Sequence, residues 1–322
     1  MPKKVKVGVI GLGNMGRHHA THYADIPLAQ LVAVCDINPV LVASFSAQYQ
    51  CKGYTDLTEM LQTEGLDAVS IIAPTKLHYA FAKQVIEHGV SVLIEKPIAE
   101  TVEQADELIA LAKKHQVVLT VGHIERFNPA VMALKARLSE LGQIVSIHTK
   151  RAGVFPPQIR DANVMIDLAV HDIDIISWLM NKQPIKVQRI SGRALLKNRE
   201  DYTTLLLNYG GDDFPQTGIV EVNWITPKRV RHLIITGTQG YAELDYLNQE
   251  LIMYVSHTSA ASDEADHLKM AFAEPEKVTI DKKAPLDAEL THFLTCVDQK
   301  SLPIVSGEDA REALRLALSG GL

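Results

Sequence analysis

The sequence predicts an α/β protein, with a doubly wound parallel sheet first and then an α+β domain built on a large, mainly antiparallel open sheet. Two observations predict this fold class. Over the first third of the chain, short apolar segments alternate with helical patterns, which is typical of a parallel sheet covered on both faces. After Gly122, strand-like segments follow one another across short turns such as Gly237–Gly240, and such connections favour antiparallel pairing.

Apolar runs and helical periodicity give the expected elements in order. The N-terminal strands are Val5–Ile10, Leu31–Cys35, Ala68–Ala73, Val90–Ile94 and Val117–Val121, with helices near Met15–Tyr23, Pro39–Gln48, His78–His88 and Thr101–His115. Later strands are Gln143–Arg151, Lys186–Ser191, Thr203–Tyr209, Gly218–Trp224, Val230–Thr236, Ala242–Tyr246 and Leu251–Val255. Later helices are Pro129–Leu141, Val164–Leu179, Pro285–Gln299 and Glu308–Leu318. We therefore expect two domains, residues 1–122 and 123–322.

The first strand runs directly into a glycine-rich turn. Gly11, Gly13 and Gly16 have the spacing in which the first glycine permits a tight turn, the second lets the backbone approach a pyrophosphate, and the third lets the helix pack closely. Asn14 and Met15 begin the helix, whose N-terminal N–H groups attract phosphate. Asp36 ends the next strand, at the expected distance of about 20 residues. The segment predicts dinucleotide binding, against the alternative of a turn that binds nothing.

The end of the second strand indicates which dinucleotide is preferred. The Asp36 carboxylate can accept hydrogen bonds from the adenosine ribose hydroxyls and would repel a 2′-phosphate. The residues after it, Ile37, Asn38 and Pro39, supply no cation for such a phosphate. We expect NAD rather than NADP. Further cofactor-binding residues are expected beside Asp36 and at the ends of the later strands, where the ligands of such sheets bind: Ile37, Pro74, Thr75, His78, Glu95 and Lys96.

The helix Val164–Leu179 combines an apolar surface with a polar stripe. Asp167, His171 and Asp174 are spaced i, i+4 and i+7, so they share a face. An aspartate one turn before a histidine can orient the imidazole and favour its charged form, which makes the histidine a better proton acceptor. The alternative is a buried pair that only fixes helix packing. His171 and Asp172 point to different faces of a helix, so no metal site is predicted.

Lys96 follows the strand Val90–Ile94 within the tripeptide Glu95-Lys96-Pro97. An ammonium at this place could donate hydrogen bonds to a substrate hydroxyl and to the nicotinamide ribose, and its charge would favour a developing alkoxide. The alternative for this tripeptide is an ordinary solvated loop.

Composition excludes some classes of protein. The net charge of −6 argues against nucleic-acid binding, although a local basic patch would suffice for an anionic small substrate. Three separated cysteines suggest reduced thiols and a cytoplasmic protein. The first strand begins almost at the N-terminus, so we expect no signal peptide, and no apolar run has the length of a membrane span.

These features together resemble the Gfo/Idh/MocA family of NAD(P)-dependent oxidoreductases. The resemblance rests on GLGNMGRHHA (Gly11–Ala20), Asp36, APTKLH (Ala73–His78), EKP (Glu95–Pro97), GHIERFNP (Gly122–Pro129) and DLAVHDID (Asp167–Asp174). It implies a Rossmann domain followed by an α/β domain whose open sheet often forms oligomer interfaces. It also implies that Lys96, Asp167 and His171 are catalytic. In that mechanism His171 takes the proton of the substrate hydroxyl, Asp167 orients the His171 ring, and Lys96 positions the hydroxyl.

The same resemblance bears on the substrate. GHIERFNP looks like the motif of UDP-N-acetylglucosamine 3-dehydrogenases, which implies oxidation of the sugar 3-hydroxyl. The alternatives are a free sugar or inositol as substrate and, from another class, a non-catalytic NAD(P)-dependent sensor. Expected substrate-binding residues are His123, Arg126, Asn163 and His171, and candidate cations for a diphosphate are Arg126, Arg151, Arg160, Lys228, Arg229 and Arg231. Arg126 could equally be structural, and the arginines near residue 230 could be solvated or lie at an interface. Because an open sheet needs its far face covered, we also expect a homodimer or homotetramer.

Overall fold

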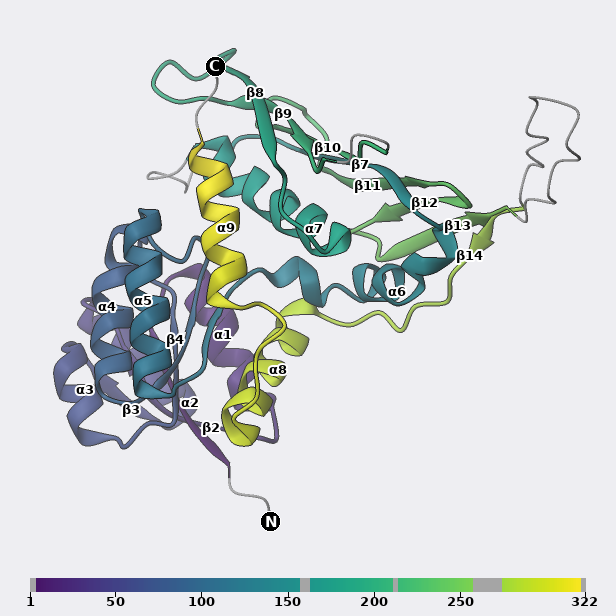
Figure 1. The fold of residues 1–322 in the computed structure, drawn as a ribbon. Coiled ribbons are helices and arrows are strands. Elements are labelled where there is room, and N and C mark those ends of the chain that lie inside the picture. The colour runs from purple at the N-terminus through teal and green to yellow at the C-terminus, as the bar shows by residue number, and fades with distance from the viewer. Residues whose placement is uncertain (1–3, 157–162, 211–213, 257–273, 320–322) are drawn as a thin grey trace, which may run out of the picture. The chain divides into compact units, whose positions relative to one another are not determined.

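The computed structural model describes residues 4–156, 163–210, 214–256 and 274–319 (Figure 1). Its contacts divide the chain into two compact units, which are described separately below. Unit 1 comprises Met1–Phe127 and Ala284–Arg315, and unit 2 comprises Asn128–Lys283 and Leu316–Leu322. In the described part of the chain, no helix is long and apolar enough to cross a membrane.

Unit 1 is built on a parallel sheet with the strand order β3-β2-β1-β4-β5-β6. The strands are β1 (Val5–Ile10), β2 (Ala29–Cys35), β3 (Lys52–Tyr54), β4 (Ala68–Ile71), β5 (Ser91–Ile94) and β6 (Leu119–Val121). The helices α1 (Asn14–Asp25), α2 (Pro39–Tyr49), α3 (Leu57–Thr63), α4 (Thr75–Glu87) and α5 (Val102–His115) connect them. The order reverses between β1 and β4, which is the point where sheets of this type bind their ligands.

The central strands of unit 1 are buried on both faces. Every residue of β4 and β5 is buried, and in Figure 1 the helices α4 and α5 lie side by side along the sheet. The predicted doubly wound parallel sheet is therefore confirmed. The short elements β3 and α3 were not predicted, because three and seven residues are too few to show a clear hydrophobic period.

Unit 2 contains a larger sheet with the order β14-β13-β12-β11-β7-β10-β9-β8. Its strands are β7 (Ile144–Ala152), β8 (Lys186–Gly192), β9 (Tyr202–Asn208), β10 (Thr217–Asn223), β11 (Val230–Gly237), β12 (Gly240–Asp245), β13 (Glu250–Val255) and β14 (Glu276–Lys277). All neighbours pair antiparallel except β7 and β10, which are parallel. The mainly antiparallel sheet was thus predicted correctly.

One face of the unit 2 sheet is buried and the other is open. Along β9 and β11, buried and exposed residues alternate, as expected for a sheet with one covered face. The helices α6 (Pro129–Arg137) and α7 (Val170–Met180) pack against it, and Figure 1 shows both on the same side of the sheet.

The C-terminal helices do not follow the predicted division at residue 122. The predicted second domain included all residues from 123 to 322, whereas α8 (Pro285–Gln299) and most of α9 (Gly307–Leu318) group with unit 1. The reason is the apolar stripe of α8. Leu286, Leu290 and Phe293 are buried in the same core cluster as Val5 and Val7 of β1.

The helix expected at Val164–Leu179 is not a uniform α-helix. It begins with a π-helical turn, η3 (Met165–Ala169), and continues as α7. A single turn of this kind often occurs at functional sites. The periodicity of the sequence could not reveal it, because apolar residues surround the segment on nearly all sides.

Candidate functional site

The three glycines of the loop after β1 play different structural roles. Gly11 has φ +89°, and a Cβ there would stand 2.2 Å from the carbonyl oxygen of Ile72. A Cβ on Gly16 would stand 1.9 Å from the carbonyl oxygen of Gly11, whereas a Cβ on Gly13 would meet nothing within 4 Å. Gly11 and Gly16 therefore permit tight packing within the protein, and Gly13 leaves open space at the start of α1.

The Asp36 carboxylate is fixed beside this loop by two backbone groups. The N–H of Leu12 donates to Oδ2 over 2.7 Å, and the N–H of Asn38 donates to Oδ1 over 2.8 Å. Each carboxylate oxygen keeps a further lone pair, so the group can still accept hydrogen bonds from a diol. The next residue, Ile37, is 91% exposed and offers an apolar surface to a flat ring.

The turn after β4 is linked to the turn after β5 by His78. Pro74 and Thr75 begin α4, and the buried His78 ring lies 2.8 Å from the carbonyl oxygens of both Ala73 and Pro97. Both ring nitrogens are thus occupied by backbone groups. His78 stays a predicted cofactor-binding residue, and its buried ring links the backbone of the two turns that carry Thr75 and Lys96.

Glu95 and Lys96 lie directly after β5, at the edge of the sheet where the glycine-rich loop begins. The Nε2 of His19 is 3.2 Å from Oε1 of Glu95, and the Lys96 N–H donates to Oε2 over 3.2 Å. Burial alone would raise the pKa of Glu95, but His19, the Lys96 charge and the Lys96 N–H hold it below its usual value. A half-buried carboxylate that favours its charged form therefore precedes the lysine.

The candidate catalytic pair of unit 2 lies at the junction of η3 and α7. Asp167 and His171 are both half-buried, and they are one helical turn apart. The indole Nε1–H of Trp224, which follows β10, donates to Oδ2 of Asp167 over 3.3 Å. Trp224 itself is buried and contacts the ring of Phe155 edge-on. Trp224 was not predicted as a site residue, since no local sequence pattern connects it with Asp167, 57 positions earlier.

Asn163 begins this helical segment. Its Oδ1 accepts a hydrogen bond from the N–H of Ile166 over 3.1 Å, and its backbone carbonyl accepts one from the N–H of Asp167 over 3.0 Å. The residue predicted to bind substrate therefore also caps the turn that carries Asp167.

A buried ion pair fixes the start of α7. Nε and Nη2 of Arg151 donate to the two carboxylate oxygens of Asp172 over 2.9 and 3.1 Å, and the two side chains are 5% and 1% exposed. The Arg151 guanidinium also lies over the ring of Tyr246. This two-point contact joins β7 to the residue after His171, so it restrains the backbone that carries the histidine.

The structure separates the candidate cations for a diphosphate. Arg126 is buried and donates to Asp309 and to the carbonyl of Ile304, which favours its structural alternative, and Arg151 pairs with Asp172. The candidates near β11 have different surroundings. Arg231 donates to the carbonyls of Ala152 and Val230. Lys228 and Arg229 are exposed in the loop before β11. Arg160 lies outside the described residues. His123, which was predicted to bind substrate, is buried in the segment that follows β6.

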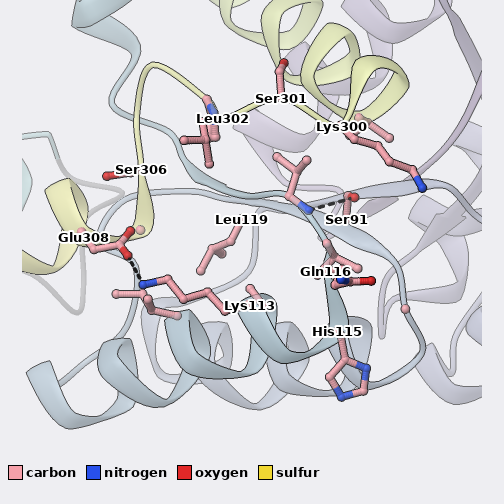
Figure 2. Close-up of a pocket in the computed structure, with 18 residues that line it drawn as sticks. Ser91, Lys113, His115, Gln116, Leu119, Lys300, Ser301, Leu302, Ser306 and Glu308 are labelled. Carbon is pink, nitrogen blue, oxygen red and sulfur yellow. Dashed lines mark hydrogen bonds and ion pairs between the residues drawn. The ribbon is translucent and has the colours of Figure 1, made fainter.

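A separate cavity of about 440 Å³ lies at the opposite edge of the unit 1 sheet (Figure 2). It is bounded by the starts of β5 and β6 and by the segment between α8 and α9. The ion pair of Lys113 with Glu308, 2.6 Å long, lies beside it, while His115 points away from it in Figure 2. Its polar side chains do not converge on one point, and it is not the dinucleotide site.

The fold and the glycine-rich loop define a dinucleotide-binding protein with a Rossmann domain. Residues 5–123 match "Oxidoreductase family, NAD-binding Rossmann fold", and residues 135–318 match "Oxidoreductase family, C-terminal alpha/beta domain". The chain belongs to the Gfo/Idh/MocA oxidoreductase family. It is a dehydrogenase that acts on CH–OH donors with NAD as cofactor, and the open space at Gly13 and the fixed Asp36 carboxylate fit that cofactor.

Two curated relatives are similar over nearly the whole chain. The UDP-N-acetylglucosamine 3-dehydrogenase of Acidithiobacillus ferrooxidans is 31% identical over 98% of this chain and 95% of its own. The scyllo-inositol 2-dehydrogenase (NAD⁺) of Bacillus subtilis is 26% identical over 99% and 94%. A solved structure of the former, GnnA, superposes with a TM-score of 0.86 and 30% identity, covering 98% of this chain and 96% of that chain.

Proposed function

We propose that this dehydrogenase oxidises the 3-hydroxyl of UDP-N-acetylglucosamine to a 3-keto sugar. The observation that carries the proposal is the similarity over nearly the whole chain to the Acidithiobacillus ferrooxidans enzyme of that name. The segment Gly122–Pro129, with the sequence GHIERFNP, supports the same substrate because it resembles the motif of such enzymes.

The proposed reaction gives separate roles to three side chains. His171 accepts the proton of the reacting hydroxyl as general base. Asp167, oriented by the Trp224 indole, turns the imidazole and stabilises its charged form. Lys96 donates a hydrogen bond to the reacting oxygen and stabilises the charge that develops on it. Bound NAD supplies the nicotinamide carbon that accepts the hydride.

The cofactor residues are assigned by the same proposal. The N–H groups at the start of α1, at Gly13, Asn14 and Met15, would bind the pyrophosphate, since that end of the helix is positive. Asp36 would accept the adenosine ribose hydroxyls, and Ile37 would cover the adenine. Gly11 and Gly16 hold the loop in shape, Pro74 and Thr75 line the same edge, and Glu95 supports Lys96.

The substrate test is NADH formation, followed by its near-ultraviolet absorbance. Purified protein with NAD is given UDP-N-acetylglucosamine, its galacto epimer, free glucose or myo-inositol, with a carbonyl trap in each assay because 3-keto formation can be unfavourable. We expect turnover on the UDP-sugars. Turnover on inositol or glucose alone would contradict the proposed substrate.

Two variants test the assigned roles. Lys96→Ala should abolish turnover but bind NAD, whereas in a sensor without catalysis it would leave partner binding intact. Arg229→Ala, in the exposed loop before β11, should raise KM for the UDP-sugar about tenfold with kcat unchanged, if this loop holds the diphosphate. An unchanged KM would remove Arg229 from the substrate site.

The second candidate is oxidation of an inositol. It is supported by the similarity to the Bacillus subtilis scyllo-inositol 2-dehydrogenase over 99% of this chain. The burial of Arg126 and Arg151 in ion pairs also favours it, because neither side chain is then an obvious ligand for a diphosphate. Activity on scyllo- or myo-inositol above that on UDP-sugars would establish this alternative.

We further propose a homodimer or homotetramer formed through the open face of the unit 2 sheet. In register across this face lie Ile234, His148, Ile219 and Leu206 on β11, β7, β10 and β9. Leu206 and Ile234, at the two ends of this row, are exposed apolar residues, and exposed apolar side chains on an open sheet face are suited to contact with a second copy. Leu206→Glu should give monomers in analytical ultracentrifugation, and a wild type that is monomeric at micromolar concentration would contradict the proposal.

A further inference from the structure

A buried carboxyl, Glu289 on α8, lies within electrostatic range of the Glu95 carboxylate and has no role in the reaction proposed above. Glu289 is 2% exposed, and neither carboxyl oxygen has a hydrogen-bond partner among the described residues. Leu286 and Leu290 flank it in the core of unit 1. Ionising a carboxyl in such surroundings costs free energy, because burial removes the water that would hydrate the charge and no hydrogen-bond donor of the described residues takes its place.

The groups around Glu289 do not offer it a positive partner. From α1, Tyr23 is hydrogen-bonded to Ser70 and His19 is hydrogen-bonded to Glu95. On the neighbouring 3₁₀ turn η1 (Ile124–Phe127), Arg126 pairs with Asp309. On α8 itself, the Nε2 of His292 accepts the N–H of Ile304, and Asp287 lies near His22 at the surface.

Glu95 has the opposite surroundings. It receives hydrogen bonds from His19 and from the Lys96 N–H, and the Lys96 charge is close. A buried carboxyl and a half-buried one that interact electrostatically do not both ionise readily, since like charges repel strongly away from water. The negative charge of the pair therefore belongs on Glu95, and the proton belongs on Glu289.

We propose that Glu289 is a positioning residue for Lys96, a neutral carboxylic acid that keeps the Glu95 carboxylate charged and hydrogen-bonded to His19 and to the Lys96 amide. The peptide group between Glu95 and Lys96 is thereby fixed where β5 ends. A second negative charge at Glu289 would drive a proton onto Glu95, which would weaken both of its hydrogen bonds and change the potential at the Lys96 ammonium.

The proposal predicts a dependence of stability on pH. Burial first, and the Glu95 charge second, raise the pKa of Glu289 well above its usual value. Unfolded glutamate titrates near 4.3, so above about that pH the unfolded chain loses a proton that the folded protein keeps. The folded state therefore loses stability as the pH rises toward the folded pKa. Glu289→Gln, which has no proton to lose, removes this contribution.

The first experiment needs neither substrate nor cofactor. Infrared spectra near neutral pH are compared for the wild type, Glu289→Gln and the control Glu87→Gln, which replaces an exposed glutamate of α4. We expect the carbonyl band of a protonated carboxylic acid in the wild type and the control but not in Glu289→Gln. Melting curves from about pH 5 to about pH 8 should show the wild type losing stability relative to Glu289→Gln. A wild type without that band would overturn the proposal.

The second experiment follows catalysis and rests on the proposed function of Lys96. The kcat of Glu289→Gln should stay within about twofold of the wild type at neutral pH and decline less at alkaline pH, whereas Glu289→Ala should lose about tenfold. Identical alkaline limbs for the wild type and Glu289→Gln would overturn the positioning role. Absence of turnover by the wild type on every substrate would contradict the proposed function instead, and the infrared and melting results would then decide the protonation of Glu289.

Discussion

The two units of this dehydrogenase hold their functional groups by different means. In unit 1 the groups assigned to the cofactor are largely backbone atoms and short side chains at the ends of parallel strands, and they follow from the glycine-rich turn at Gly11–Gly16. In unit 2 the candidate proton acceptor is a side chain on a helix, held by contacts with strands distant in sequence. Asp172 is bound by Arg151 of β7, and Asp167 is bound by Trp224 after β10.

This difference shows that substitutions harm the two kinds of site for different physical reasons. The backbone site depends on the absence of atoms, as at Gly13 and Gly16. The side-chain site depends on long-range polar contacts, which are expensive to break when they are buried. Substitutions can therefore separate folding from function in the first unit more readily than in the second.

The largest expected effect is on the buried ion pair of unit 2. Asp172→Asn leaves the Arg151 guanidinium without its buried countercharge and should lower the free energy of unfolding by about 3–5 kcal/mol. Urea unfolding followed by tryptophan fluorescence reports on this unit, because both tryptophans, Trp178 and Trp224, belong to it. Glu250→Gln, in an exposed pair with Lys277, should cost less than about 1 kcal/mol. Equal losses in the free energy of unfolding would show that the buried Arg151–Asp172 pair stabilises the protein no more than an exposed pair does.

Substitutions at two glycines of the loop should have different effects, one on stability (Gly16) and the other on NAD binding (Gly13). Gly16→Ala places a methyl group against the Gly11 carbonyl and should destabilise unit 1 by about 2 kcal/mol or more. Gly13→Ala meets no protein atom within 4 Å, so it should change stability by less than about 1 kcal/mol and weaken NAD binding about tenfold. Circular dichroism melts and NAD titrations separate the two effects. A Gly13→Ala variant with wild-type NAD affinity would place the pyrophosphate elsewhere.

The smallest expected effect concerns the contact between Trp224 and Asp167. Trp224→Phe keeps an aromatic ring beside Phe155 but removes the indole N–H, so kcat should fall about three- to tenfold, which corresponds to a net hydrogen bond of about 1 kcal/mol. Trp178→Phe is the matched control, because the Trp178 ring lies under the Lys135 ammonium, and it should leave kcat unchanged. A kcat for Trp224→Phe equal to that of the control would show that Asp167 does not need the indole.

Much of unit 1 followed from the sequence because its signals are local. The strands at Val5–Ile10 and the neighbouring segments were predicted within a few residues, and the glycine spacing indicated both the loop and the cofactor. The assignment of α8 to this unit did not follow, because a helix near the end of the chain carries no mark of the strand against which its apolar stripe packs. The roles of His19 and Glu289 were missed for the same reason.

The sequence by itself determined the order of the longer elements, the parallel and antiparallel sheets, and the residue types available for chemistry, since hydrophobic period and glycine spacing act over a few residues. The tertiary structure decided which of the candidate cations bind other groups of the protein, that His78 links the turns after β4 and β5, and that the polar helix begins with a π-helical turn. It also placed Glu289 within electrostatic range of Glu95. These contacts join residues many positions apart, and only the closing of the chain around a core brings such side chains into the low-dielectric surroundings that set their charge and their role.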